Sequence, residues 1–356
     1  MQSITKNELM KHIRTALCSF GMSGKLFHAP FLDSHPNFEL YAALERTKNS
    51  AKESYPHIKT FRTLEALLKD KTIELVILNT PNITHYEMAK QIINCGKHLV
   101  VEKPFTVSVS EANDLIDLAR AKQTHLSVYH NRRWDSDFKT VQSVLEQGLI
   151  GTIVDAEIRF DPYNPNLSYK LHKENPTEGV GSLYDLGSHL IDQALQLFGM
   201  PTAVFAHLAA FRENSRVDDY FDLKLFYPTH NVSLKSSYFV REPLPAYVFH
   251  GTQGSFIKTR SDIQETDLQN GIRPNVDHWG RESRSAQGLL HTMNGNLAHK
   301  EFINSENGNY RIYYDKIYEA IRNNGVLPVS AEEGRSVIQI IEAAKNSNAQ
   351  RRVIDL

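Results

Sequence analysis

The sequence predicts an α/β protein: a doubly wound parallel sheet followed by an α+β domain that carries an open, mostly antiparallel sheet. Short apolar runs alternate with helical patterns up to residue 131, which is typical of βαβ units with right-handed crossovers. Beyond that point, extended segments follow one another with few helices between them, as in antiparallel sheets. A chain of 356 residues is long enough for two domains. We therefore expect domains at residues 1–131 and 132–356.

In the first domain, we expect strands at residues 15–20, 38–44, 75–79, 98–101 and 126–129. The third of these segments reads Leu-Val-Ile-Leu-Asn, and its continuous apolar character favours a strand buried on both faces. Helical patterns lie between the strands, at residues 63–69, 85–94 and 108–121. Ser108, with Glu111 three residues later, fits a capping box at the start of the last of these helices.

In the second domain, we expect a first helix at residues 135–147 and one long helix at residues 182–198. Residues 262–300 are polar and rich in Gly, Asn and His, so a long loop region is expected there. Two helices, at residues 310–322 and 330–347, are expected to close the chain. The extended segments expected to form the sheet are 153–160, 203–211, 219–227, 231–238 and 247–251.

The composition excludes several classes of protein. Lys and Arg number 40 and Asp and Glu number 41, which argues against a nucleic-acid binder that works by charge. No apolar run reaches the roughly 18 residues that span a bilayer, and the polar residues 1–11 lack the apolar stretch of a signal peptide. Cys18 and Cys95 alone cannot build a disulfide framework or a zinc site. We therefore expect a cytoplasmic protein with reduced thiols, no membrane contact and no metal.

A glycine-containing loop follows the first predicted strand. The segment Ser-Phe-Gly-Met-Ser-Gly, from Ser19 to Gly24, resembles the pattern GxGxxG with Ser in the place of the first glycine. Small residues let a backbone approach a pyrophosphate, which the following helix start then binds. Two glycines after a strand also occur in ordinary turns. The position of the loop in the first βαβ unit, and Glu45 about 20 residues further on, favour a dinucleotide site.

Polar residues also end three later strands of the first domain. Glu102 and Lys103 end the fourth predicted strand, where a lysine can donate to a substrate oxygen and stabilise a developing alkoxide. A solvated lysine before a proline turn is the alternative. Since ligands bind at the carboxyl edge of open α/β sheets, polar ends on neighbouring strands favour a site. The other ends are Asn79-Thr80-Pro81 with His85, and Tyr129-His130-Asn131-Arg132-Arg133.

A third cluster lies at the start of the long helix in the second domain. Asp185 and His189 are four residues apart and share a helix face. A histidine of near-neutral pKa beside a carboxylate suits general acid–base catalysis; a surface ion pair is the alternative. Gly187 inside a helix costs about 1 kcal/mol relative to Ala, which indicates a close approach by a backbone or a ligand.

At these residues the chain resembles the glucose–fructose oxidoreductase/inositol dehydrogenase family, called Gfo/Idh/MocA. Three motifs match in order: the phosphate loop with Phe-His-Ala-Pro at 27–30, Glu-Lys-Pro at 102–104, and Asp-Leu-Gly-Ser-His at 185–189. Within the family, the similarity is greatest to NADP-dependent scyllo-inositol dehydrogenases, on residues 127–135, 183–193 and 327–334. The resemblance implies an N-terminal Rossmann domain for the cofactor and a C-terminal domain for substrate binding and oligomerisation.

The resemblance also implies roles for the clustered residues. Lys103 would hydrogen-bond the reacting oxygen and the nicotinamide ribose, Asp185 would hold a polyol hydroxyl, and His189 would take the hydroxyl proton as hydride leaves the same carbon. These three form the expected catalytic set, and Tyr163 joins them as a substrate-binding residue. The expected cofactor-binding residues are Phe20, Gly21, Met22, Ser23, Gly24, Glu45, Arg46, Thr80, Pro81, His85, Glu102, Lys103, Asn131 and Arg132.

The choice of cofactor, NADP or NAD, is left open by the residues after the second strand. Glu45 is suited to accept the ribose hydroxyls of NAD and to repel a 2′-phosphate. Arg46, which follows directly, can pair with a 2′-phosphate. If Glu45 turned outward to pair with Lys48, Arg46 would be free for NADP, and we lean slightly to NADP. Ser19 and Glu45 are the two departures from the family pattern.

The expected activity is hydride transfer between NAD(P) and the CH–OH group of a cyclic polyol or sugar, with a scyllo-inositol-type substrate favoured. An aldose dehydrogenase of the same family is one alternative, and a non-catalytic dinucleotide-binding regulator is another. A regulator has no chemical need for Lys103, Asp185 and His189 together, which favours the enzyme. The run of strands in the second domain has a second face to bury, so a homo-oligomer, dimer or tetramer, is expected.

Overall fold

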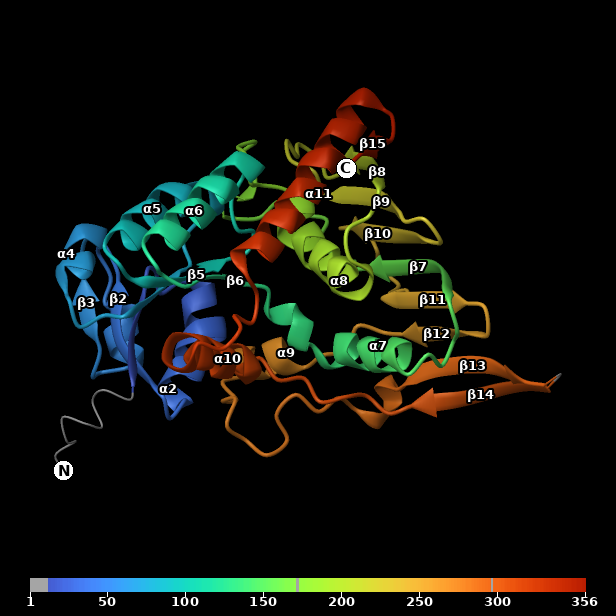
Figure 1. Cartoon of the computed structure of the whole chain (residues 1–356), viewed down its shortest axis with the longest axis horizontal. Coiled ribbons are helices and arrows are strands. Elements are labelled where there is room, and N and C mark those ends of the chain that lie inside the picture. Colours follow the sequence, from blue (N-terminus) through green and yellow to red (C-terminus); the bar gives the residue numbers. More distant parts are fainter. Residues whose placement is uncertain (1–11, 171–172, 296) are drawn as a thin grey trace.

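The computed structural model describes residues 12–170, 173–295 and 297–356 of the chain. The polar segment 1–11, on which the expectation of no signal peptide rests, lies outside the described residues. Two sheets dominate the architecture, each covered by helices (Figure 1). The first belongs to the N-terminal part of the chain and the second to the remainder, as the sequence predicts.

The first sheet has six parallel strands in the order β3-β2-β1-β4-β5-β6. This is the doubly wound Rossmann order, whose connections place helices on both faces. All four residues of β4 are buried, in accord with its apolar sequence. The three-residue strand β3 was not predicted. The strands are β1 (Ile13–Leu17), β2 (Phe38–Leu44), β3 (Lys59–Phe61), β4 (Leu75–Leu78), β5 (His98–Glu102) and β6 (Leu126–Tyr129).

Side-chain caps begin two helices of this domain where the sequence places them. Thr63 accepts from Ala66 N–H, and Ser108 accepts from Glu111 N–H. The Glu111 carboxylate accepts from Val107 N–H at 3.2 Å and not from Ser108 N–H, so the capping box is only half formed. The helical segments are η1 (Gly24–His28), α2 (Ala29–Ser34), α3 (Ser50–Ser54), α4 (Leu64–Lys69), η2 (Asn82–Thr84), α5 (His85–Asn94) and α6 (Val109–Ala121).

The second sheet has nine strands in the order β14-β13-β12-β11-β7-β10-β9-β8-β15. Among the described strands, β7 and β10 pair in parallel and every other neighbouring pair is antiparallel. The strands are β7 (Ile153–Arg159), β8 (Ala203–Ala209), β9 (Tyr220–Phe226), β10 (Asn231–Ser237), β11 (Tyr247–Gly251), β12 (Gly254–Lys258), β13 (Gly288–Asn294), β14 (Leu297–Ile303) and β15 (Ile354–Asp355).

The expected long loop at residues 262–300 is wrong. The structure contains a short helix there, α9 (Gln264–Gln269), and a hairpin of β13 and β14 that projects from the sheet (Figure 1). Six of the seven residues of β14 are exposed. Because such a strand buries almost nothing, its sequence has no apolar alternation from which it could be predicted.

The helices of the second domain connect it to the first. α11 (Ala331–Gln350) packs against α6 of the Rossmann domain and against α8 and β8 of the second domain (Figure 1). A Cβ atom on Gly334 would lie 2.5 Å from Val128 Cγ2, so this helix needs glycine where it crosses β6. The remaining helical segments are η3 (Asn131–Trp134), α7 (Ser136–Glu146), η5 (Leu183–Gly187), α8 (Ser188–Phe198), η6 (Arg284–Ala286) and α10 (Arg311–Asn323).

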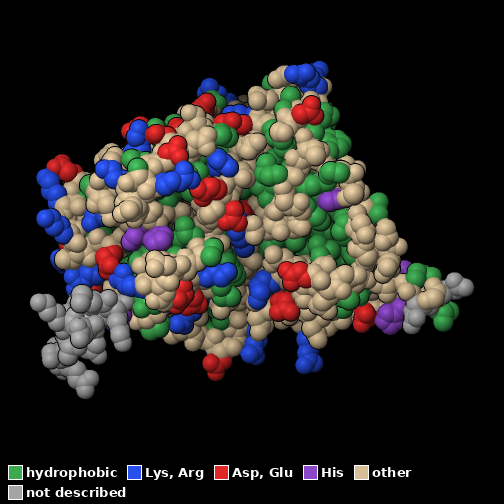
Figure 2. Space-filling view, in the orientation of Figure 1, with side chains coloured by type: hydrophobic (Ala, Val, Ile, Leu, Met, Phe, Trp, Pro, Cys, Tyr) green, Lys and Arg blue, Asp and Glu red, His purple; other side chains and the backbone are tan. Residues whose placement is uncertain are grey.

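The surface differs between the two parts. Charged side chains of both signs are intermixed over the Rossmann domain, whereas hydrophobic side chains gather over the second domain near α8 and its sheet (Figure 2). No helix in the described part of the chain is long and apolar enough to cross a membrane.

Candidate active site

The carboxyl ends of four neighbouring strands lie along one edge of the Rossmann sheet. Strands β1, β4, β5 and β6 are adjacent, and the parallel pairing of β5 with its two neighbours continues to their last residues. The residues that follow these strands are therefore brought together: Ser19, Asn79, Lys103 and His130. This is the edge at which open α/β sheets bind ligands.

Ser19 in the phosphate loop is hydrogen-bonded to Asn79, which follows the neighbouring strand β4. Ser19 N–H donates to Asn79 Oδ1 at 2.9 Å, Ser19 Oγ donates to Asn79 O at 2.8 Å, and Asn79 Nδ2 donates to Ser19 O at 3.0 Å. A Cβ atom on Gly24 would lie 2.5 Å from Ser19 O, so only glycine fits there. At the exposed Gly21, a Cβ atom would have no neighbour closer than 3.9 Å. The loop thus presents an open backbone, which fits a pyrophosphate.

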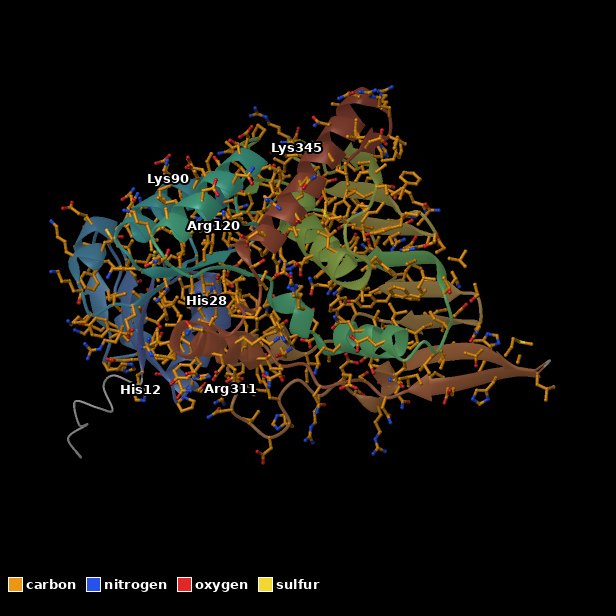
Figure 3. All side chains as sticks on the ribbon, in the orientation of Figure 1. His12, His28, Lys90, Arg120, Arg311 and Lys345 are labelled. Atoms are coloured by element: carbon orange, nitrogen blue, oxygen red, sulfur yellow. The ribbon has the colours of Figure 1, made fainter. Side chains whose placement is uncertain are left out.

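A chain of buried hydrogen bonds connects this loop to the end of β5 and to α10. Ser23 Oγ donates to Glu102, whose Oε1 lies 2.9 Å from His28 Nε2. His28, labelled in Figure 3, points its ring into the interior, and its Nδ1 atom lies 2.7 Å from the hydroxyl of Tyr314 in α10. Burial alone would raise the pKa of Glu102, but the hydrogen bonds and charge of its neighbours lower it overall. Glu102 therefore holds the loop beside Lys103 as an anion.

Lys103 and Asp185 meet across the two domains. Lys103 Nζ donates to Asp185 Oδ1 at 2.7 Å and to Asp185 O at 2.9 Å. The second carboxylate oxygen of Asp185 accepts from Lys173 Nζ at 3.0 Å. The positive charge of Lys103, followed by that of Lys173, holds the pKa of Asp185 far below its usual range. Asp185 is therefore an anion that can accept hydrogen bonds and cannot serve as an acid near neutral pH.

His189 is 5% exposed and lies one helical turn beyond Asp185. The sequence predicts a near-neutral pKa beside a carboxylate, and this is wrong. Asp185 pairs with the two lysines, and no hydrogen bond joins it to His189. Burial, and then the charges of Lys103 and Arg132, lower the pKa of His189 well below its ordinary value. The imidazole is therefore neutral at neutral pH and able to accept a proton.

The predicted long helix is divided at the site. Asp185 lies in a short π-helical segment, η5, and His189 lies in the regular helix α8. Such π-turns are frequent at functional sites. The Asp218 carboxylate accepts from Ser182 Oγ and from Leu183 N–H, and so fixes the start of η5. The Leu183 side chain makes a close approach at Gly187, where a Cβ atom would lie 3.0 Å from it.

Glu45 does not turn outward to Lys48. Its carboxylate accepts from Ser50 N–H at 3.1 Å and from Ala51 N–H at 3.0 Å, and the residue is 8% exposed. The start of α3 explains this orientation, since its free N–H groups favour a carboxylate. Arg46 is exposed next to it. The guanidinium of Arg62 donates to the carbonyls of Glu45 and Lys48 and so braces this turn.

Among the other residues expected to bind the cofactor or the substrate, His85 and Tyr163 make contacts with protein groups. His85 has 0% exposure and its nitrogens lie 3.0 Å from Pro104 O and 2.9 Å from Thr80 O. It therefore holds the ends of two strands together, and its ring is not available to a cofactor. The hydroxyl and ring of Tyr163 contact Arg241, and its role in substrate binding stays a prediction. At the sheet edge, Phe20 and Asn131 are buried, Met22 and Pro81 are exposed, and Thr80 and Arg132 are half-buried.

Four residues near the site make contacts that the sequence did not predict. Lys173 contacts Asp185, His28 contacts Glu102, His130 lies beside His189, and Arg62 braces the turn after β2. For His28 and His130 a signal existed, because both lie within motifs that the resemblance quotes. Lys173 and Arg62 lie in segments without a pattern. Within the described residues, no group of three or more His, Cys, Asp or Glu side chains could hold a metal ion.

The fold and the site define a two-domain oxidoreductase whose Rossmann domain binds a nicotinamide dinucleotide. Residues 13–130 match the family model for the NAD-binding Rossmann fold of this oxidoreductase family, and residues 142–356 match the model for its C-terminal alpha/beta domain. The chain therefore belongs to the Gfo/Idh/MocA family of oxidoreductases, as its motifs indicate.

Relatives cover the whole chain. It is 40% identical over 344 residues to scyllo-inositol 2-dehydrogenase (NADP(+)) IolW of Bacillus subtilis, covering 97% of this chain and 96% of that protein. It is 36% identical to the uncharacterized oxidoreductase YdgJ of Escherichia coli, covering 97% and 99%. Among solved structures, the oxidoreductase yvaA of Bacillus subtilis matches with a TM-score of 0.95 at 39% identity, covering 100% of both chains.

Proposed function

We propose that this protein oxidises a CH–OH group of a cyclic polyol or sugar with NAD(P), and that its substrate is of the scyllo-inositol type. One observation carries the proposal: Lys103, at the edge of the cofactor sheet, is bonded to Asp185 of the other domain, one helical turn from His189. A donor, an anionic acceptor and a neutral base thus converge where the two domains meet.

The roles follow from the chemistry of these groups. The nicotinamide cofactor, when bound, supplies the hydride acceptor, and the loop from Ser19 to Gly24 would hold its pyrophosphate. Lys103 donates to the reacting oxygen and stabilises the charge that develops on it. His189, neutral because its pKa is lowered, takes the hydroxyl proton. Asp185, which remains anionic, accepts from a neighbouring hydroxyl.

The polyol assignment is supported by this combination of groups. Vicinal hydroxyls both donate and accept, and Asp185 lies between two ammonium groups that can serve the same substrate, Lys103 and Lys173. The relative named scyllo-inositol 2-dehydrogenase supports the same class at 40% identity.

A substrate panel tests the proposal. Inositol isomers and aldoses are each mixed with the purified protein and NADP or NAD, and nicotinamide absorbance is followed, with Lys103→Met as the inactive control. We expect turnover with at least one inositol isomer. Turnover of an aldose without any signal from inositols would contradict the substrate class and favour an aldose dehydrogenase. Binding of dinucleotide without turnover of any substrate would favour a regulator.

We propose NADP as the preferred cofactor. The outward turn of Glu45 to Lys48, which the sequence analysis linked to NADP, is absent, because the Glu45 carboxylate accepts from two backbone N–H groups of α3. The proposal of NADP is supported instead by Arg46 and by the relative named as an NADP enzyme. Arg46 is exposed beside Glu45 and can pair with a 2′-phosphate.

The affinity of Arg46→Ala tests this preference, with Lys52→Ala in the exposed part of α3 as the matched control. Loss of a charge-assisted hydrogen bond, about 1.5–3 kcal/mol, should weaken NADP about 10- to 100-fold and leave NAD unchanged. Unchanged NADP binding in Arg46→Ala, together with loss of NAD use in Glu45→Ala, would make the protein an NAD enzyme.

A homo-oligomer is also part of the proposal. Apolar side chains remain exposed on strands of the second sheet and on the segments between them, among them Val154, Phe205, Phe211, Phe239 and Leu244. Exposed apolar surface of this extent favours association. Light scattering should show a dimer or tetramer at micromolar concentration; a strict monomer would contradict it.

A further inference from the structure

Two buried histidines face one another where the domains meet, and their nitrogens are not all used. His130, which directly follows β6, is 1% exposed, and neither of its ring nitrogens has a hydrogen-bond partner among the described residues. The buried Nδ1 atom of His189 also has no partner in that part of the chain. The two rings are nearly perpendicular, at 83°, and their centroids are 6.4 Å apart.

These unpaired nitrogens contrast with the other fully buried histidines. His28 and His85 each engage both ring nitrogens with protein groups at 2.7–3.0 Å. Buried polar atoms are almost always hydrogen-bonded, and the exceptions indicate a functional group or a water molecule. His130 therefore differs from a histidine that merely fills the core.

One water molecule can bridge one nitrogen of His130 to Nδ1 of His189. Two hydrogen bonds of about 2.9 Å span nitrogens up to roughly 5.8 Å apart. The ring centroids are 6.4 Å apart. A nitrogen on the side of one ring that faces the other ring lies closer to it than the centroid does, so this separation is compatible with such a bridge. A buried water needs two to four polar partners, and the unpaired nitrogens of His130 and His189 supply them.

We propose that His130 is a positioning residue that acts on His189 through a bridging water: it fixes the tautomer of His189 and accepts the proton that His189 takes from the substrate. The proposal rests on the proposed function, since it deepens the role of His189 there. A general base of this kind normally has its second nitrogen held by a hydrogen bond. No side chain in the described part of the chain bonds to Nδ1 of His189, which leaves this place to the water and His130.

The proton follows a balanced route. The substrate O–H bond breaks and its proton joins the outward nitrogen of His189, while the electron pair of the C–H bond leaves with the hydride to oxidised NAD(P). The Nδ1–H proton of His189 passes to the water, and the water passes one of its protons to His130. In total, one proton has moved from the substrate to His130, and His189 is neutral again.

The charged groups around His130 permit this transfer. Burial lowers the pKa of His130, so the ring is neutral and able to accept. The carboxylates of Asp192, in α8, and Glu333, in α11, favour the protonated ring, whereas Arg133 and Lys103 oppose it. The proton is therefore held only transiently, which suits a relay that must release it to solvent.

The test compares His130→Leu with His130→Gln, which retains hydrogen-bonding groups, and with the control His98→Leu at the amino end of β5. In His130→Leu, kcat should fall about 10²-fold, a loss at the low end for acid–base catalysis, with KM within about twofold. His130→Gln should recover part of this loss, and His98→Leu should retain kcat. An unchanged kcat in His130→Leu would overturn the proposal, and so would an equal loss in all three variants.

A second readout needs neither cofactor nor turnover. Nitrogen chemical shifts of ¹⁵N-histidine-labelled protein report the tautomer of each ring. We expect one tautomer at His189 in the unmodified protein and a mixture in folded His130→Leu, with His130→Gln intermediate. If the His189 signals were the same in all of them, His130 would not act on His189. This result is distinguishable from failure of the proposed function, which would abolish turnover and leave these signals as expected.

Discussion

Replacing Lys103 by Met removes one ammonium group and retains a side chain of similar length. Its Nζ atom donates to Asp185 Oδ1 at 2.7 Å and to Asp185 O at 2.9 Å, and the side chain is 18% exposed. The substitution therefore removes the donor assigned to the reacting oxygen. It also removes the largest charge contribution to the lowered pKa of both Asp185 and His189.

The expected magnitude comes from these two effects. Loss of one donor to a developing oxyanion costs about 2.7–4 kcal/mol, or roughly 10²–10³ in kcat. In addition, the pKa of His189 should rise, because a positive neighbour no longer disfavours its protonated form. Oxidation needs neutral His189, and activity is lost as the pH falls through its pKa. The acid limb of the pH profile should therefore move to higher pH in Lys103→Met.

Steady-state oxidation of the polyol across the acid and neutral range measures both effects. Lys173→Met is the matched control, because it also removes an ammonium group from Asp185 but is not among the principal charges that lower the pKa of His189. It should lose less than about tenfold in kcat and keep the acid limb in place. Lys103 would not have the assigned role if Lys103→Met turned over within threefold of the unmodified protein, or if its acid limb moved to lower pH.

Four further substitutions probe the loop, the substrate contact and the domain junction. Gly24→Val places a Cβ atom 2.5 Å from Ser19 O and should lower both Tm and dinucleotide affinity, whereas Gly21→Ala should lower dinucleotide affinity alone. Calorimetry measures both quantities, and the same changes in the two variants would contradict the loop geometry. Asp185→Asn should reduce kcat/KM for the polyol about 10- to 100-fold through loss of a charged acceptor, and an unchanged kcat/KM would remove Asp185 from the substrate contact. Arg133→Met leaves the buried Asp192 without its partner at 2.7 Å and should lower the free energy of unfolding by about 3–5 kcal/mol; a loss below about 1 kcal/mol in urea titration would show that the pair contributes little.

The sequence predicts well the strands and helices that bury one or both faces. Strands β2 and β6 and helix α5 have the bounds that the pattern indicates, since apolar runs and helical periodicity record which face is buried. The β13–β14 hairpin was missed for the opposite reason. Its second strand buries almost no side chain, so the sequence of β14 carries no periodic signal.

The site was predicted in part, because motifs record local spacing and not the partners that a residue meets in space. The strand order places Lys103 at the carboxyl edge of the Rossmann sheet, but its bond to Asp185 depends on the packing of the second domain against that edge. The lowered pKa of His189 depends on burial and on charges from other elements, and these could not be inferred from a spacing of four residues. Glu45 is similar: its partners are the backbone N–H groups of a short helix, and a motif does not specify them.

In the proposed reaction, groups from both domains act on one CH–OH group. A crystal structure of the protein with NADP and scyllo-inositol tests this most directly. We predict one hydroxyl oxygen within hydrogen-bond distance, about 2.6–3.2 Å, of both Lys103 Nζ and a ring nitrogen of His189, with Asp185 accepting from a neighbouring hydroxyl. A polyol bound with no hydroxyl near either Lys103 or His189 would contradict the account.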